Sequence, residues 1–83
     1  MALTFPNRSR SYDEVRKAVR FLGYDGMFEV PFLVQAEALV PPSKVTEADC
    51  LAAFDASRDS IYDVARRAYA RGRGTTLTPA DFR

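Results

Sequence analysis

The sequence contains no histidine and only one cysteine, Cys50. A zinc site of the usual nitrogen and sulfur type therefore has no ligand set, and neither a Ser/His nor a Cys/His nucleophile pair is possible. Most hydrolase mechanisms are excluded, whereas a carboxylate-only site for magnesium or for acid–base chemistry is not. We expect no catalytic residues, no cofactor and no metal. One cysteine also precludes an internal disulfide, which suits a reducing compartment.

Long apolar runs are absent as well. No uninterrupted stretch approaches the roughly 18–20 residues that cross a bilayer, and the N-terminus lacks the apolar segment of a secretory signal. We therefore expect a cytoplasmic protein with no membrane partner. The 83 residues suit a single domain, residues 1–83. A chain this short buries only roughly 60–65% of its unfolded surface, so a partner subunit would add needed burial.

Charge is unevenly distributed, although the net value is only +1. Residues 1–20 carry a net charge of +3, residues 21–63 a net −6 and residues 64–83 a net +4. Basic ends around an acidic middle suit self-association or contact with an anionic partner. Solvated charge runs are the commoner reason for such a pattern, and we favour that interpretation.

The clearest local pattern predicts a β-hairpin. Phe28, Val30, Phe32 and Val34 occupy every second position, directly after the turn pair Asp25-Gly26. Because a hairpin needs its first strand just before the turn, we predict strands at about 17–23 and 27–34, with a turn at 12–16. The competing pattern is a helix at 11–23, with Ser11 and Glu14 as a capping box and Gly23 as its terminator.

The two faces of this hairpin differ in character. One is wholly apolar and should meet the helix; it comprises Val19, Phe21, Phe28, Val30, Phe32 and Val34. The other carries Arg20, Leu22, Met27, Glu29, Pro31 and Leu33. It is more apolar than a solvated surface requires, so its apolar members form a candidate self-association face. These members are Leu22, Met27, Pro31 and Leu33. Pro31 should lie at an edge, at a bulge or where pairing ends.

The C-terminal half predicts one long helix. Thr46 is a good N-cap, and nothing up to Gly72 breaks the helix. Unbroken, it would extend about 40 Å, whereas a strand of about six residues spans only ~20 Å. Either it bends near 55–57, or its distal end packs on another copy. We favour the second because the interior holds neither glycine nor proline.

Short elements complete the prediction. We expect brief strands at 2–5 and 75–77, a polar loop at 8–11, a helical turn or two at 35–39 and a capped turn at 78–82. The fold class is α+β, in two layers. A small antiparallel sheet, built from the central hairpin and short terminal strands, packs on one long C-terminal helix.

Four stretches resemble a known bacterial family. They are Phe5-Pro6-Asn7-Arg8-Ser9-Arg10-Ser11-Tyr12-Asp13, Ala18-Val19-Arg20-Phe21 with Gly23-Tyr24-Asp25-Gly26, Ala53-Phe54-Asp55-Ala56 followed by Arg58 and Ile61, and Leu77-Thr78-Pro79-Ala80-Asp81-Phe82. Together they are similar to the family catalogued as domain of unknown function 1488, which has Trp where this chain has Leu22 and a longer loop before the last strand. The resemblance implies a small sheet-plus-helix domain and supports a strand at 17–23. It supplies no catalytic residues.

The basic end of the long helix is the strongest candidate for ligand binding. This possible anion or nucleic-acid patch comprises Arg66, Arg67, Tyr69, Arg71 and Arg73. The arginines would follow a phosphate backbone while Tyr69 stacks on a base. Basic residues from the N-terminal segment would extend the patch if that segment folds against the same helix end; they are Arg8, Arg10, Arg16, Lys17 and Arg20. The simpler interpretation, which we favour, is arginines that complement the helix dipole.

Two further features have simpler explanations than a ligand site. Asp55, Asp59 and Asp63 are spaced four apart, but nearby arginines predict an exposed, ion-paired helix face rather than a metal site. The helix N-terminus should lower the pKa of Cys50 somewhat, while Asp49 opposes the thiolate, so a reactive role is not favoured.

On this reading the protein is a non-enzymatic interaction module and a homodimer. Its contact surface is either the second face of the sheet or the overhanging helix end. The identity of any protein partner does not follow from the residues. Nucleic-acid binding through the basic ends is the alternative.

Overall fold

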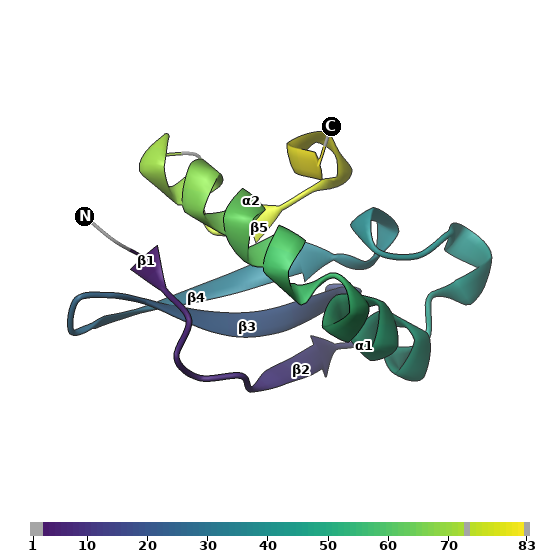
Figure 1. Cartoon of the computed structure of the whole chain (residues 1–83). Helices are drawn as coiled ribbons and strands as arrows, with labels where there is room; N and C mark the ends of the chain where they lie inside the picture. Colours follow the sequence, from purple (N-terminus) through teal and green to yellow (C-terminus); the bar gives the residue numbers. More distant parts are fainter. Residues whose placement is uncertain (1–2, 73, 83) are drawn as a thin grey trace.

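The computed structural model describes residues 3–72 and 74–82, an α+β domain (Figure 1). Its strands are β1 (Leu3–Thr4), β2 (Arg10–Asp13), β3 (Ala18–Asp25), β4 (Phe28–Gln35) and β5 (Thr76–Leu77). Its α-helices are α1 (Glu47–Ala56) and α2 (Arg58–Ala70). Short 3-10 helices occupy η1 (Ala36–Ala38), η2 (Pro42–Lys44) and η3 (Pro79–Phe82). Among these helices, none has the length and hydropathy that a membrane span needs.

The hairpin prediction is confirmed with small shifts at its ends. β3 and β4 pair antiparallel along their whole length, from Ala18↔Gln35 to Asp25↔Phe28. The two-residue connection is Gly26-Met27. Gly26 has a φ of 63°, a backbone conformation that residues with a Cβ atom rarely adopt. The helix pattern at 11–23 is not realised, because residues 11–13 pair with β3 and residues 18–23 pair with β4.

The N-terminal segment forms more of the sheet than the sequence predicts. β1 and β2 both pair antiparallel with β3, at opposite ends of the same edge, and residues 5–9 form a loop between them. The expected polar loop at 8–11 and turn at 12–16 are therefore partly wrong. Tyr12 lies opposite Val19 on the core side, while Asp13 accepts a bond from the Arg16 amide at 3.0 Å and closes the turn.

The sheet is mixed, which corrects the antiparallel prediction. β5 adds to the free edge of β4 in parallel, with Val34 opposite Leu77. The parallel direction follows from the connection: the chain returns from β4 through both helices, which cover one face of the sheet (Figure 1).

The prediction of one continuous C-terminal helix is wrong, and the alternative of a bend near 55–57 is correct. Ser57 leaves helical geometry at φ −116° and ψ 20°, so α1 ends at Ala56 and α2 begins at Arg58. The break allows both helices to follow the length of the sheet. Thr46 caps α1 as predicted, accepting a bond from the Asp49 amide at 3.2 Å.

The core lies between the inner face of the sheet and the two helices. Its fully buried side chains include Phe21, Phe32, Phe54, Ile61 and Leu77. Phe28 is the one member of the predicted inner face that the structure leaves open, with 78% of its surface exposed. It pairs with Asp25 beside the hairpin turn, and the tip of the hairpin extends past the helices in Figure 1.

Candidate functional site

The predicted basic patch is not assembled as a free surface. Arg66 donates from Nε to the Leu3 carbonyl at 3.1 Å and from a terminal nitrogen to Asp63 at 3.0 Å. Its guanidinium also lies over the Phe5 ring, 5.2 Å from the centroid. Tyr69 donates its hydroxyl to Asp25 at 2.7 Å, and its ring meets Phe32 edge-on, so it is not free to stack on a base.

The remaining predicted members are exposed or undescribed. Arg67 and Arg71 are exposed, whereas Arg73 lies outside the described residues. Arg8 and Arg10 would extend the patch only if they lay at the same end of the helix, and they do not. Both lie beside the break between α1 and α2, at the opposite end of α2 from Arg71. The N-terminal segment runs antiparallel to α2, so its basic residues meet the first turn of that helix.

The predicted self-association face lies on the side of the sheet that the helices leave uncovered (Figure 1). Leu22 and Pro31 face each other across β3 and β4, and Leu33 is opposite Arg20 in the next row. Leu22 and Leu33 are half-buried, and Pro31 is exposed. Met27, in the hairpin turn, is 94% exposed. The four residues therefore belong to one face and its adjoining tip.

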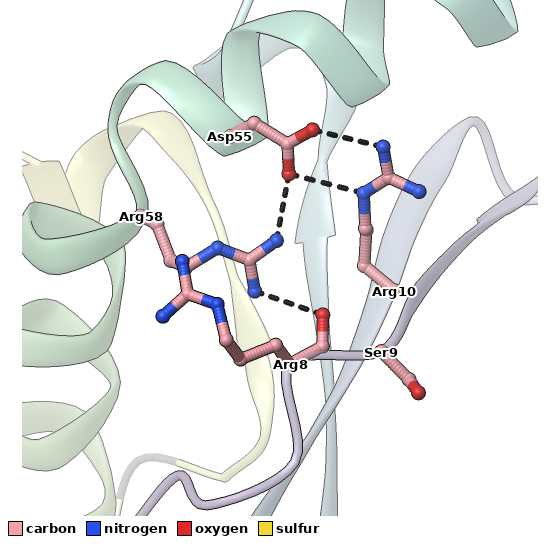
Figure 2. A pocket seen from close by; sticks show the side chains of 5 residues that line it. All are labelled: Arg8, Ser9, Arg10, Asp55 and Arg58. Atoms are coloured by element: carbon pink, nitrogen blue, oxygen red, sulfur yellow. Dashed lines mark hydrogen bonds and ion pairs between the residues drawn. The ribbon is translucent and has the colours of Figure 1, made fainter.

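A group of four charged side chains lies elsewhere, in a hollow that the sequence did not predict. Its volume is about 560 Å³, and it is lined by Arg8, Ser9, Arg10, Asp55 and Arg58 (Figure 2). The loop between β1 and β2 and the start of β2 supply the first three residues, and the break between the helices supplies the other two. We call this hollow the arginine pocket.

Asp55 is the central acceptor of the arginine pocket. Arg10 binds it with two bonds, from Nε at 3.0 Å and from a terminal nitrogen at 2.8 Å, and Arg58 adds a third at 2.7 Å. Hydrogen bonding to Arg10, followed by that to Arg58, holds the pKa of Asp55 below its ordinary value despite partial desolvation. The same bond raises the pKa of Arg10. The carboxylate therefore remains ionised and joins α1 to β2.

Arg58 is the most buried charged side chain among the described residues, with 8% exposed. Besides Asp55 it binds the Arg8 carbonyl at 3.0 Å and the Tyr62 hydroxyl at 2.8 Å. Its guanidinium also lies 4.9 Å from the centroid of the Phe54 ring. These contacts satisfy a charge that would otherwise be costly to bury, and they fasten the loop at residues 5–9 to the helix break.

Arg8 differs from its neighbours because its own side chain is exposed. Within the described part of the chain, its guanidinium has no hydrogen bond or ion pair, and only its backbone carbonyl is used. Figure 2 shows this side chain lining the same hollow as Arg10 and Arg58. The pocket thus combines one free guanidinium with two that are fixed in position.

The other sequence candidates do not form sites. The break separates Asp55 from Asp59 and Asp63, and no group of three metal-binding side chains occurs within residues 3–72 and 74–82. Cys50 is fully buried, and burial together with Asp49 raises the pKa of its thiol, outweighing the Thr46 contact. The expected lowering of that pKa is wrong, because desolvation exceeds the effect of the helix N-terminus.

The arginine pocket could have been anticipated only in part. Asp55 and Arg58 stand three apart and were expected to pair, and their ion pair is present at 2.7 Å. Arg8 and Arg10 come from a distant segment, and no periodic pattern connects the two. Both segments, however, belong to the stretches on which the family resemblance was based.

Fold and site together define the class of this protein: a small α+β domain with an uncovered sheet face and an arginine-rich pocket at its helix break. The chain belongs to the DUF1488 family, described as protein of unknown function, whose family model matches residues 3–78. No curated protein and no solved structure matches it.

Proposed function

We propose that this protein is a non-catalytic interaction module that works as a homodimer, with the uncovered faces of the two sheets packed together. The observation that supports the proposal is the apolar cluster of Leu22, Pro31 and Leu33, which lies on the face of the sheet that the described helices leave uncovered. A sheet with an uncovered apolar face buries that face by packing against a second layer. The same face of another copy can serve as that layer.

The charges on this face support a symmetric partner. Arg20 lies one row to one side of Leu22 and Pro31, and the Tyr24–Glu29 row lies on the other side. A two-fold axis across the strands at the central row would place Arg20 of each copy opposite Tyr24 of the other, with Glu29 on the neighbouring strand of the same row. Such an isologous contact joins apolar centres and brings opposite charges near each other at both ends. The single buried cysteine suits action in the cytoplasm.

The experiment compares two lysine substitutions by sedimentation velocity at micromolar concentrations. Leu22→Lys places a charge in the centre of the proposed interface. Val15→Lys is the matched control, since Val15 is 94% exposed in the turn between β2 and β3, away from this face. Circular dichroism checks that both variants keep the fold.

We expect the wild type and Val15→Lys to sediment as dimers and Leu22→Lys as a folded monomer. A monomeric wild type at tens of micromolar would refute the proposal, and so would dissociation of both variants alike. The first result would indicate that the sheet face serves a different partner or none.

A further inference from the structure

We propose that the arginine pocket binds the phosphate group of a small phosphate monoester. Three guanidinium groups and one carboxylate line the hollow, which gives it a net charge of +2. Asp55 compensates part of this charge, and the positive charge that remains attracts an anion. A phosphate monoester carries a charge of about −1.5 to −2 at neutral pH, so it matches this excess.

The available donors are those of Arg8 and Arg10. Arg10 uses Nε and one terminal nitrogen for Asp55, which leaves its second terminal nitrogen. Arg8 retains its whole guanidinium, because the described residues contain no partner for it. Guanidinium groups match phosphate geometry through paired bonds, so Arg8 is the residue that would grip the ligand.

Arg58 acts on the pocket mainly through its charge, because three of its five N–H donors are already used. Both of its terminal nitrogens are engaged, with Asp55, Tyr62 and the Arg8 carbonyl. It is held rigidly, and its charge faces little solvent, so screening reduces its attraction for an anion less than at an open surface. Its bond to the Arg8 carbonyl also holds the residue that carries the free guanidinium.

The ligand has room to extend toward α2. A second hollow of about 170 Å³ shares Arg8, Asp55 and Arg58 with the first and continues to Ser57, Asp59 and Ser60 at the start of α2. The Asp59 carboxylate limits how far an anionic group can extend in this direction. The Ser57 side chain makes no capping bond, so its hydroxyl can donate to a ligand. Asp59 in the same turn offsets the helix dipole, so the arginines supply most of the attraction.

Size and shape favour a small molecule over a nucleic-acid strand. The hollow has a volume of about 560 Å³ and opens broadly to solvent, so it can take a small phosphate group without enclosing it. A strand would need a continuous basic track with aromatic platforms. Tyr69 is instead engaged by Asp25, and the exposed Arg67 and Arg71 lie toward the other end of α2. None of the sheet-face residues lines this pocket, although Ser9 and Arg10 also line a neighbouring hollow with Leu22 and Pro31. The phosphate titration reads residues 8–10 and 57–60, so its outcome is distinguishable from that of the dimer test.

The test is a titration of isotopically labelled protein, followed by amide resonances in low-salt buffer. The probes are inorganic phosphate, phosphoserine as a free monoester, and a single-stranded oligonucleotide. Arg8→Gln removes the free guanidinium, and Arg67→Gln removes an equally exposed arginine elsewhere on α2. Because the Arg8 side chain has no partner in the described chain, this substitution should leave the fold intact.

We expect saturable shifts at residues 8–10 and 57–60 with both phosphate and phosphoserine. Arg8→Gln should weaken phosphoserine binding about tenfold, the loss typical of one hydrogen bond to a charged group, while Arg67→Gln leaves it unchanged. Equal weakening by both variants would show that bulk charge is responsible and would overturn the proposal. Binding of the oligonucleotide without phosphoserine would overturn it too, as would shifts that fail to saturate.

Discussion

The ring of Phe5 lies on the ring of Tyr62, with centroids 4.0 Å apart and planes 3° from parallel. This stack is the middle of three contacts between the N-terminal segment and α2. Arg66 binds the Leu3 carbonyl on one side of it, and Arg58 binds the Arg8 carbonyl on the other. The three helical residues are spaced four apart on one face of α2, so the segment follows the helix axis. Loss of structure in α2 would therefore also release the N-terminal segment at the edge of the sheet, and the reverse.

Gly23 is required beneath this stack. A Cβ atom at this position would lie 2.8 Å from a ring carbon of Phe5 and 3.2 Å from one of Phe32. Gly23→Ala should therefore destabilise the protein by about 1–3 kcal/mol, the usual cost of overpacking. Urea unfolding of Gly23→Ala, Phe5→Leu and the double variant measures the coupling. The double variant should lose less than the sum of the two single variants, and strictly additive losses would show that Phe5 is not the obstacle.

Arg58→Lys should also destabilise the protein despite keeping the charge. A lysine ammonium cannot reach Asp55, Tyr62 and the Arg8 carbonyl together, and a buried acceptor left unpaired costs about 1–3 kcal/mol. We expect a loss of about 2 kcal/mol in chemical unfolding. Arg67→Lys, at an exposed position of the same helix, is the control and should stay within about 0.5 kcal/mol of the wild type.

Asp55 should contribute to the loss of stability in acid. Its pKa lies below the ordinary 3.8 in the folded state, mainly through Arg10, so its contribution is present above that value and is lost as the pH falls through the folded pKa. Asp55→Asn should be less stable than the wild type at neutral pH and approach it below about pH 4. Thermal unfolding across this range tests the convergence. If Asp55→Asn were less stable than the wild type by the same amount at every pH, the loss would come from altered packing or hydrogen bonding rather than from the missing charge.

Tyr69 should show the opposite dependence in alkali. Its hydrogen bond to Asp25, followed by burial, raises its pKa above the ordinary 10.0. The contribution is complete below pH 10.0 and is lost as the pH rises through the folded pKa. In Tyr69→Phe, the free energy of unfolding should therefore fall less steeply as the pH rises above that value. Part of the remaining fall comes from Tyr12, because burial raises the pKa of Tyr12 as well. An unchanged alkaline slope would contradict this assignment.

The proposed dimer contact admits a charge-exchange test. Arg20→Glu should weaken association, because it brings acidic side chains near Glu29 of the other copy. Glu29→Arg should also weaken it, because it brings basic side chains near Arg20. The double exchange restores opposite charges across the two-fold axis and should recover most of the affinity. Arg20 also pairs weakly with Asp13 in its own chain, at 3.4 Å, so monomer stability must be measured beside the dissociation constant. Failure of the double variant to recover would exclude the proposed register.

Local chemistry made the centre of the fold predictable. The hairpin depends on alternation and a glycine turn within one stretch, and the capped start of α1 depends on residues within one helical turn. β2 was not predicted because it is short and half-exposed. Tyr12 is its only apolar side chain on the core side, so the sequence shows no alternation there. The break at Ser57 was anticipated only as the less favoured alternative, because neither glycine nor proline marks it. There the stabilising contacts come from Arg8 and Arg10, far away in the chain.

The sites divide in the same way. The uncovered sheet face follows from strand alternation alone, so Leu22, Pro31 and Leu33 were correctly placed together. The basic helix end was placed on α2, but sequence cannot show that Arg66 and Tyr69 have internal partners from β1 and β3. The arginine pocket joins residues 45 positions apart, such as Arg10 and Asp55, and no pattern within either segment specifies their contact.

The parallel partner of β4 has a consequence for how the chain folds during synthesis. β3 and β4 are neighbours in sequence and can close as soon as both are made, in the microsecond range typical of hairpins. Leu77 fills its core position beside Val34 only after both intervening helices have emerged. Until then one edge of the nascent sheet stays open to pairing with other chains, so the ribosome-bound intermediate is the form most exposed to aggregation and to chaperones.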